Sequence, residues 1–132
     1  MSQEHVELTW RMVEWFNSRD AEAAQAHSTD DVEVVPMRAA IEDTTYKGRG
    51  AYAAFRADTD EAWERIQFDP ESVREGNDRV VAIGRLATRG RGTGVDLDTR
   101  FALVLEFRGD KVSKLRAYTE IEEALEAAGL SE

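Results

Sequence analysis

The sequence predicts an α+β fold in which helices come first and an antiparallel sheet follows. In the first half, apolar residues recur at three- and four-residue intervals, which is the spacing of helices that bury one side. In the second half, long β segments are joined by turns that contain glycine. Helices on one face of a curved sheet leave a conical space that side chains need not fill. A length of 132 residues suits one hydrophobic core, so one domain over 1–132 is expected.

Three helices are expected before the main sheet. The segment 4–17 is amphipathic, and Asp20 is a suitable N-cap for a short alanine-rich helix that ends at Ala26. A longer helix is expected over 50–65, with Trp63 on its apolar side. A fourth helix is expected near the end of the chain, starting at a capping box over 119–122 and stopped by Gly129. The helical segments therefore flank the strand-rich part.

The strands are expected at 32–36, 79–88, 95–107 and 111–118, and the last three form an antiparallel meander. Pro36 ends the first strand because proline cannot donate to a central ladder. Between 95 and 103 the odd positions are apolar or nearly so, which predicts that they face the core. The segment that follows Pro36 is expected to be a loop.

The composition and charge of the chain argue against several kinds of partner and cofactor. A net charge of −10 would repel a phosphate backbone, so no nucleic-acid partner is expected. The N-terminal segment is polar and no long uncharged apolar run follows it, so neither export nor a membrane partner is expected. A cytoplasmic protein is therefore expected. The chain has no cysteine, and His5 and His27 lack the spacing of a metal site. No metal and no cofactor are therefore expected.

Several stretches of the sequence resemble one known family over nearly the whole chain. They are Glu7 to Asp20 with its ending Trp15-Phe16-Asn17-Ser18-Arg19-Asp20, the step Tyr46-Lys47-Gly48-Arg49, the hairpin 89–94, the segment 109–118 and the segment 123–130. In their residue pattern and their order along the chain, these stretches resemble SnoaL-like proteins of the nuclear transport factor 2-like superfamily. The resemblance implies a cone-shaped fold, with a curved antiparallel or mixed sheet and helices on its concave face. It leaves the function open, because the superfamily includes isomerases, cyclases, epoxide hydrolases, dehydratases, transport factors and binding modules.

The catalytic residues of these relatives do not carry over. Ketosteroid isomerases need a carboxylate base, a tyrosine and a protonated carboxyl group, and the corresponding positions here hold Pro36, Met12 and Leu103. Limonene epoxide hydrolases use an Asp-Arg-Asp arrangement, and its positions align with Ala87, Arg85 and Ala117. The pocket aspartate of polyketide cyclases has no clear counterpart. Whether the protein is an enzyme therefore stays open, and Arg85 is the best catalytic candidate.

Arg85 is expected on an inward face of its strand, among Val81, Ile83 and Ala87. A buried, unpaired guanidinium would cost several kcal/mol, so it needs either a carboxylate partner or a ligand that bears an anionic or carbonyl oxygen. The structural alternative pairs Arg85 with a loop carboxylate, Glu42 or Asp43. For Arg85, this structural pairing is slightly favoured over ligand binding.

The main functional hypothesis is a pocket for a small, apolar, ring-bearing molecule such as a polyketide, terpenoid or steroid-like compound. The residues expected to line it are Met12, Phe16, Val34, Pro36, Tyr46, Phe55, Trp63, Arg85, Leu103, Leu115 and Ala117. A second hypothesis is a dimerising interaction domain whose core is filled by its own side chains. A third is a cyclase, isomerase or hydrolase that uses other carboxylates, for example Asp43 or Glu33.

A homodimer is expected through the outer face of the sheet, where apolar and basic residues mix. The residues expected there are Arg100, Ala102, Val104, Arg116 and Tyr118. An antiparallel sheet with a partly apolar second face often buries that face against another subunit.

Overall fold

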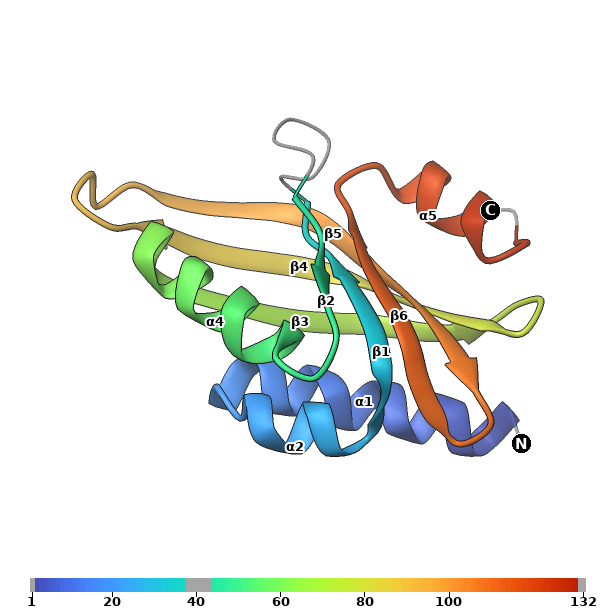
Figure 1. The fold of residues 1–132 in the computed structure, drawn as a ribbon. Helices are drawn as coiled ribbons and strands as arrows, with labels where there is room; N and C mark the ends of the chain where they lie inside the picture. The colour runs from blue at the N-terminus through green and yellow to red at the C-terminus, as the bar shows by residue number, and fades with distance from the viewer. Residues whose placement is uncertain (1, 38–43, 131–132) are drawn as a thin grey trace.

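A computed structural model describes residues 2–37 and 44–130 and shows a six-stranded, curved, mixed sheet with helices (Figure 1). The helices are α1 (Ser2–Ser18), α2 (Ala21–Ala26), α4 (Ala51–Ala62) and α5 (Ile121–Ala127). The strands are β1 (Ser28–Val35), β2 (Tyr46–Lys47), β3 (Trp63–Glu75), β4 (Arg79–Gly90), β5 (Asp96–Arg108) and β6 (Lys111–Tyr118). The sheet is not closed into a barrel. The predicted α+β class is confirmed.

The strand order in the sheet is β2-β1-β6-β5-β4-β3. The strands β4 to β6 pair as antiparallel neighbours, as the predicted meander requires. The strand β3 adds to it as an antiparallel neighbour of β4, whereas β1 lies parallel to β6. The short β2 pairs antiparallel with β1 and occupies part of the expected loop. Strands β2 and β3 therefore form the two edges of the sheet.

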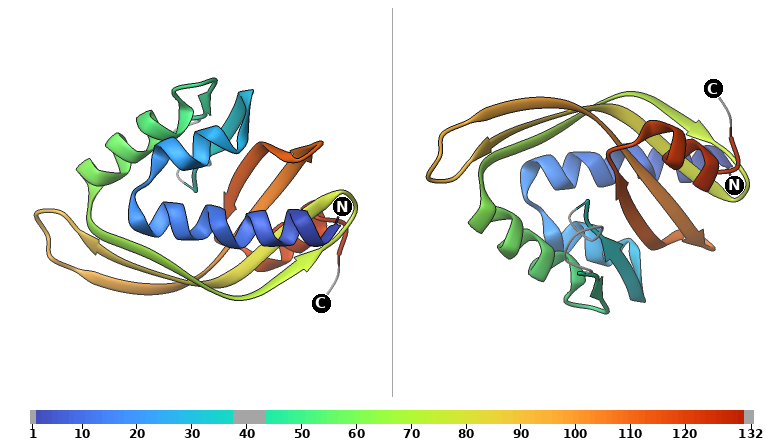
Figure 2. Two further views of the ribbon diagram at one scale, coloured as in Figure 1. Left: turned by 90° about the horizontal axis from the view of Figure 1, so that it is seen from below. Right: turned by 90° about the horizontal axis from the view of Figure 1, so that it is seen from above.

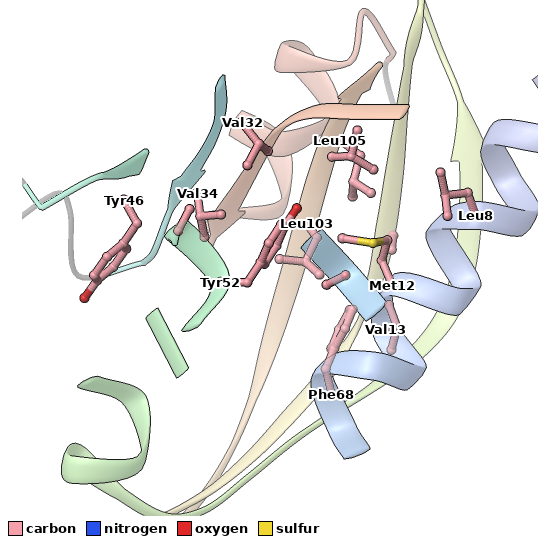
Figure 3. Close-up of a cluster of buried hydrophobic side chains, with 14 of the residues drawn as sticks. Leu8, Met12, Val13, Val32, Val34, Tyr46, Tyr52, Phe68, Leu103 and Leu105 are labelled. Carbon is pink, nitrogen blue, oxygen red and sulfur yellow. The ribbon is translucent and has the colours of Figure 1, made fainter. Parts of the chain in front are cut away.

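The helices α1, α2 and α4 lie on the concave face of the sheet, and α5 lies on the other face (Figure 2). Met12 of α1 and Tyr52 of α4 share a core cluster with Leu103 and Leu105 of β5. Figure 3 shows this cluster between helix and sheet. On the opposite face, Leu125 of α5 packs with Val104, the next residue along β5. Because neighbouring strand residues point to opposite faces, both faces of the central strands are buried.

The end of the third expected helix is wrong. The helix α4 stops at Ala62, and Trp63 begins β3, an edge strand of 13 residues that the sequence reasoning missed. The two register shifts of β3 relative to β4 interrupt its alternation of apolar and polar residues. At the other end of the chain, Gly129 follows α5 with φ of 75°, as a residue that ends a helix does, but Glu120 is the N-cap and its side chain makes no capping hydrogen bond. The expected capping box is therefore not formed.

Within the described parts of the chain, no helix is both long and apolar enough to cross a bilayer.

Candidate functional site

A cavity of about 180 Å³ lies between α1, α2, α4 and the concave face of the sheet. An apolar cavity of roughly 150 Å³ is large enough to admit a benzene ring, so this one can take a ring-bearing molecule. Four aromatic residues of its wall are only partly buried: Trp15, Phe16, Phe55 and Trp63.

All the residues expected to line a pocket do line this cavity, except Tyr46 and Arg85. They are Met12, Phe16, Val34, Pro36, Phe55, Trp63, Leu103, Leu115 and Ala117. The wall also contains residues that the sequence reasoning did not select: Trp15, Asp20, Ala21, Ala24, Val35, Met37, Tyr52, Arg56, Thr59, Ala62, Ile66, Phe68, Leu86 and Phe101. The structure thus brings residues from eight helices and strands together around one space, and their contact with a ligand stays a prediction.

Tyr46 is buried but lies outside the cavity wall. Its hydroxyl donates a hydrogen bond to Oδ2 of Asp58 at 2.5 Å, and its ring meets the ring of Phe55 edge-on, with centroids 5.8 Å apart. In Figure 3 its hydroxyl points away from Leu103. Tyr46 therefore supports Phe55 from behind and does not reach the space that Phe55 lines.

The inward orientation expected for Arg85 is wrong. Leu86 lines the cavity, so the alternation of β4 directs Arg85 to the opposite face, where it pairs in register with Arg100. Its Nε lies 2.7 Å from Oδ1 of Asp98, and the side chain is 46% exposed. Hydrogen bonding to Asp98 and the charge of that carboxylate raise the pKa of Arg85. The guanidinium therefore has a carboxylate partner outside the cavity, and Glu42 and Asp43 lie outside the described residues.

The cation beside the cavity is Arg56, which the sequence reasoning missed. Its side chain is only 11% exposed, and its guanidinium lies 5.2 Å from the ring centre of Phe16. Its Nη2 and Nε donate to Oδ1 of Asp60 at 2.8 and 3.2 Å, and its Nη1 donates to the carbonyl of Phe16 at 3.0 Å. The helical spacing of Tyr52, Phe55, Arg56 and Thr59 was the available signal, since residues three and four apart share a helix face.

Tyr52 contributes its ring to the cavity wall, but its hydroxyl proton is used in a hydrogen bond outside the cavity. Burial raises the pKa of Tyr52 to about 12. Its hydroxyl lies 2.9 Å from Oγ of Ser28, which itself donates to the carbonyl of Ala24 at 2.8 Å. Because Ser28 has one hydroxyl proton, Tyr52 is the donor in their hydrogen bond. Tyr52 is therefore committed to holding α4 against β1 and is a poor acid or base near neutral pH.

Carboxylates are scarce in the described part of the wall. Asp20 is the only one there, and its Oδ1 accepts the backbone N–H of Ala23 at 3.0 Å as the N-cap of α2. Glu33, an alternative catalytic candidate, lies outside the wall, 3.9 Å from Nζ of Lys47. Asp43 is outside the described residues. Within 2–37 and 44–130, no group of three or more His, Cys, Asp or Glu could hold a metal ion. The described wall can therefore bind an apolar ring and offer N–H donors.

The outer face expected to form a dimer is partly occupied by the chain itself. Ala102 and Val104 are buried, and both pack with residues of α5. Arg100 and Arg116 remain exposed, and the guanidinium of Arg116 lies 5.2 Å from the ring centre of Tyr118. The expectation that Ala102 and Val104 are open to a second subunit is therefore wrong, because α5, which comes after β6 in the chain, packs on them. Dimerisation itself stays a prediction.

Comparisons with solved structures place the fold. An NTF2-like protein of unknown function from Burkholderia pseudomallei is 16% identical with a TM-score of 0.78, over 95% of this chain and 97% of that one. TerC, co-crystallised with polyporic acid, is 19% identical with a TM-score of 0.78, over the same shares. A putative SnoaL-like polyketide cyclase from Jannaschia sp. is 18% identical with a TM-score of 0.77, over 99% and 95%. At these identities the likeness concerns the fold alone.

Sequence comparison identifies the family. No curated protein matches the chain. A family model described as a SnoaL-like domain matches residues 10–115, a range that starts in α1 and ends in β6 and so covers most of the cavity wall. The chain therefore belongs to the SnoaL-like domain family.

Proposed function

We propose that this protein binds a small, apolar, ring-bearing molecule in the cavity between α1, α2, α4 and the sheet. The observation that carries the proposal is the wall itself, in which aromatic and aliphatic side chains surround about 180 Å³. Aromatic residues such as Phe16 and Phe55 line this space and can pack against the ring of a ligand. The structure of TerC with polyporic acid supports the proposal, because a chain of the same fold binds a small organic molecule.

The proposal stops at binding. A cyclase, isomerase or hydrolase needs a positioned acid or base within reach of its substrate. In the described wall the only carboxylate is Asp20, which caps α2, and the hydroxyl of Tyr52 already donates to Ser28. Turnover by a carboxylate such as Asp43 remains a separate hypothesis.

The neutral probe N-phenyl-1-naphthylamine tests the cavity, because its fluorescence rises when it enters an apolar site. We expect it to bind the wild-type protein at one site per chain. Ala117→Phe should weaken that binding at least tenfold, because Ala117 lines the cavity and the added ring would fill it. The measurement is a fluorescence titration at fixed protein concentration.

Ala87→Phe is the matched control. Ala87 lies on β4 and pairs with Asp98, on the face away from the cavity. This variant should bind the probe as the wild type does. Equal affinity of all three proteins, or no binding to any of them, would reject the cavity as a ligand site.

A further inference from the structure

Arg56 is the only cation in the described wall of the cavity. Its side chain is 11% exposed, so it is largely shielded from bulk water. The guanidinium lies over the ring of Phe16, which stacks on the ring of Phe55 with centroids 6.1 Å apart. A charged group therefore sits at the edge of an aromatic surface on which a ligand ring would pack.

The orientation of Arg56 is fixed before any ligand binds. A guanidinium carries five N–H groups, and the hydrogen bonds to Asp60 and to the carbonyl of Phe16 use three of them. One N–H on Nη1 and one on Nη2 have no partner among the residues the structure describes. A side chain held on two sides loses little rotamer freedom when a further acceptor arrives, which favours binding at that point.

The carboxylate that pairs with Arg56 also pairs with a second cation. Arg19 Nε lies 3.9 Å from Oδ1 of Asp60, the same carboxylate oxygen that Arg56 contacts at 2.8 Å. Two guanidinium groups therefore share one carboxylate. Asp20, the carboxylate of the wall, accepts the backbone N–H of Ala23 at the start of α2. In a chain of net charge −10, this is a specific place for an anionic oxygen.

We propose that Arg56 binds an acidic oxygen of the ligand, so that the cavity takes ring-bearing acids in preference to neutral compounds of the same shape. The oxygen belongs to a carboxylate, sulfonate or enolate attached to the rings, and it accepts the two free N–H groups of Arg56. This inference rests on the proposed function and names the chemical class that the cavity selects.

Two probes with the same rings test it. 8-Anilinonaphthalene-1-sulfonate carries a sulfonate, whereas N-phenyl-1-naphthylamine lacks it. Arg56→Met should weaken binding of the sulfonate probe about tenfold or more, the effect of losing a charge-assisted hydrogen bond, and change binding of the neutral probe less than twofold. Arg56→Lys should restore part of the affinity for the sulfonate. Thermal unfolding of each variant verifies that it is folded.

Arg85→Met is the matched control, since Arg85 is also paired with an aspartate but lies outside the cavity wall. It should leave both affinities unchanged. Asp60→Asn is a second test, which works even if Arg56→Met fails to fold. By removing the carboxylate that competes for Arg56, it should tighten binding of the sulfonate probe severalfold.

The outcomes separate the two proposals. No binding of either probe to the wild type would reject the cavity as a ligand site. Binding of the neutral probe alone would reject the role of Arg56 and leave the cavity intact. The same conclusion follows if Arg56→Met weakens both probes equally, or if Asp60→Asn does not tighten binding of the sulfonate probe.

Discussion

Gly84→Ala is expected to destabilise the protein by on the order of 3 kcal/mol and to lower its melting temperature by roughly 10 °C. A Cβ at this position would lie 2.1 Å from the carbonyl oxygen of Asp69 and 2.6 Å from Cα of Pro70. These are backbone atoms of β3, so no side-chain rotation relieves the contact. Gly84 sits in the middle of β4, opposite Pro70 on one side and Phe101 on the other. The whole edge strand would have to move.

Gly50→Ala is the control for this prediction. Gly50 has φ of −96°, which any residue adopts, and a Cβ there would meet no heavy atom within 4 Å. Its stability should change by less than about 1 kcal/mol, since Ala is a poorer N-cap than Gly but reduces the freedom of the unfolded chain. Thermal unfolding followed by circular dichroism compares the variants with the wild type. Equal melting temperatures for G84A and G50A would show that β3 yields easily and would contradict the prediction.

The elements with strong local signals were predictable from the sequence. The strand β6 has the predicted bounds, and β4 and β5 differ from theirs by one or two residues. The helix α2 begins after Asp20, whose side chain makes the expected capping hydrogen bond to Ala23. In these segments a period of two or a capping residue determines the local structure without help from distant parts of the chain.

The edge strand β3 was not predictable in the same way. Its sequence contains Pro70 and many charged residues, and its alternation shifts at two irregularities, between Trp63 and Arg65 and between Pro70 and Ser72. Apolar residues at 63 and 66 also continue the helical spacing of α4. Pairing with β4 decides between the two periods, and that pairing is a tertiary contact that local spacing does not contain.

The faces of the sheet were the least predictable feature for the site. Residues of both faces are buried in β4 and β5, because α5 covers Val81, Ile83, Ala102 and Val104. Apolar character therefore does not identify the concave face, and Arg85 was placed on the wrong one. Cross-strand partners point to the same face of a sheet, and Arg85 pairs with Arg100, which the alternation of 95–103 predicts to face outward. This pairing contradicts the predicted inward orientation of Arg85. Arg56 was missed because a charged residue in an amphipathic helix is ordinarily assigned to solvent.

Asn17→Ala is expected to destabilise the protein by roughly 2–3 kcal/mol, the cost of leaving a buried donor and a buried acceptor without partners. The side chain of Asn17 donates from Nδ2 to the carbonyl of Phe68 at 2.8 Å and accepts the N–H of Phe68 at Oδ1 at 2.9 Å. Phe68 is fully buried in β3, and on that edge strand its N–H and carbonyl point away from β4. The end of α1 therefore satisfies a free strand edge through one amide side chain.

Two further variants separate this role from general loss of the helix end. Ser18→Ala changes the neighbouring exposed residue, whose hydrogen bond of 3.4 Å is weak, and should leave stability nearly unchanged. Asn17→Asp keeps an acceptor for the N–H of Phe68 but loses the donor to its carbonyl, so it should lose stability while retaining protection of that N–H. Hydrogen exchange at the Phe68 amide, measured by NMR, should be faster than wild type only in Asn17→Ala. Unchanged exchange in Asn17→Ala would contradict the prediction, because burial of Phe68 alone would then protect this amide.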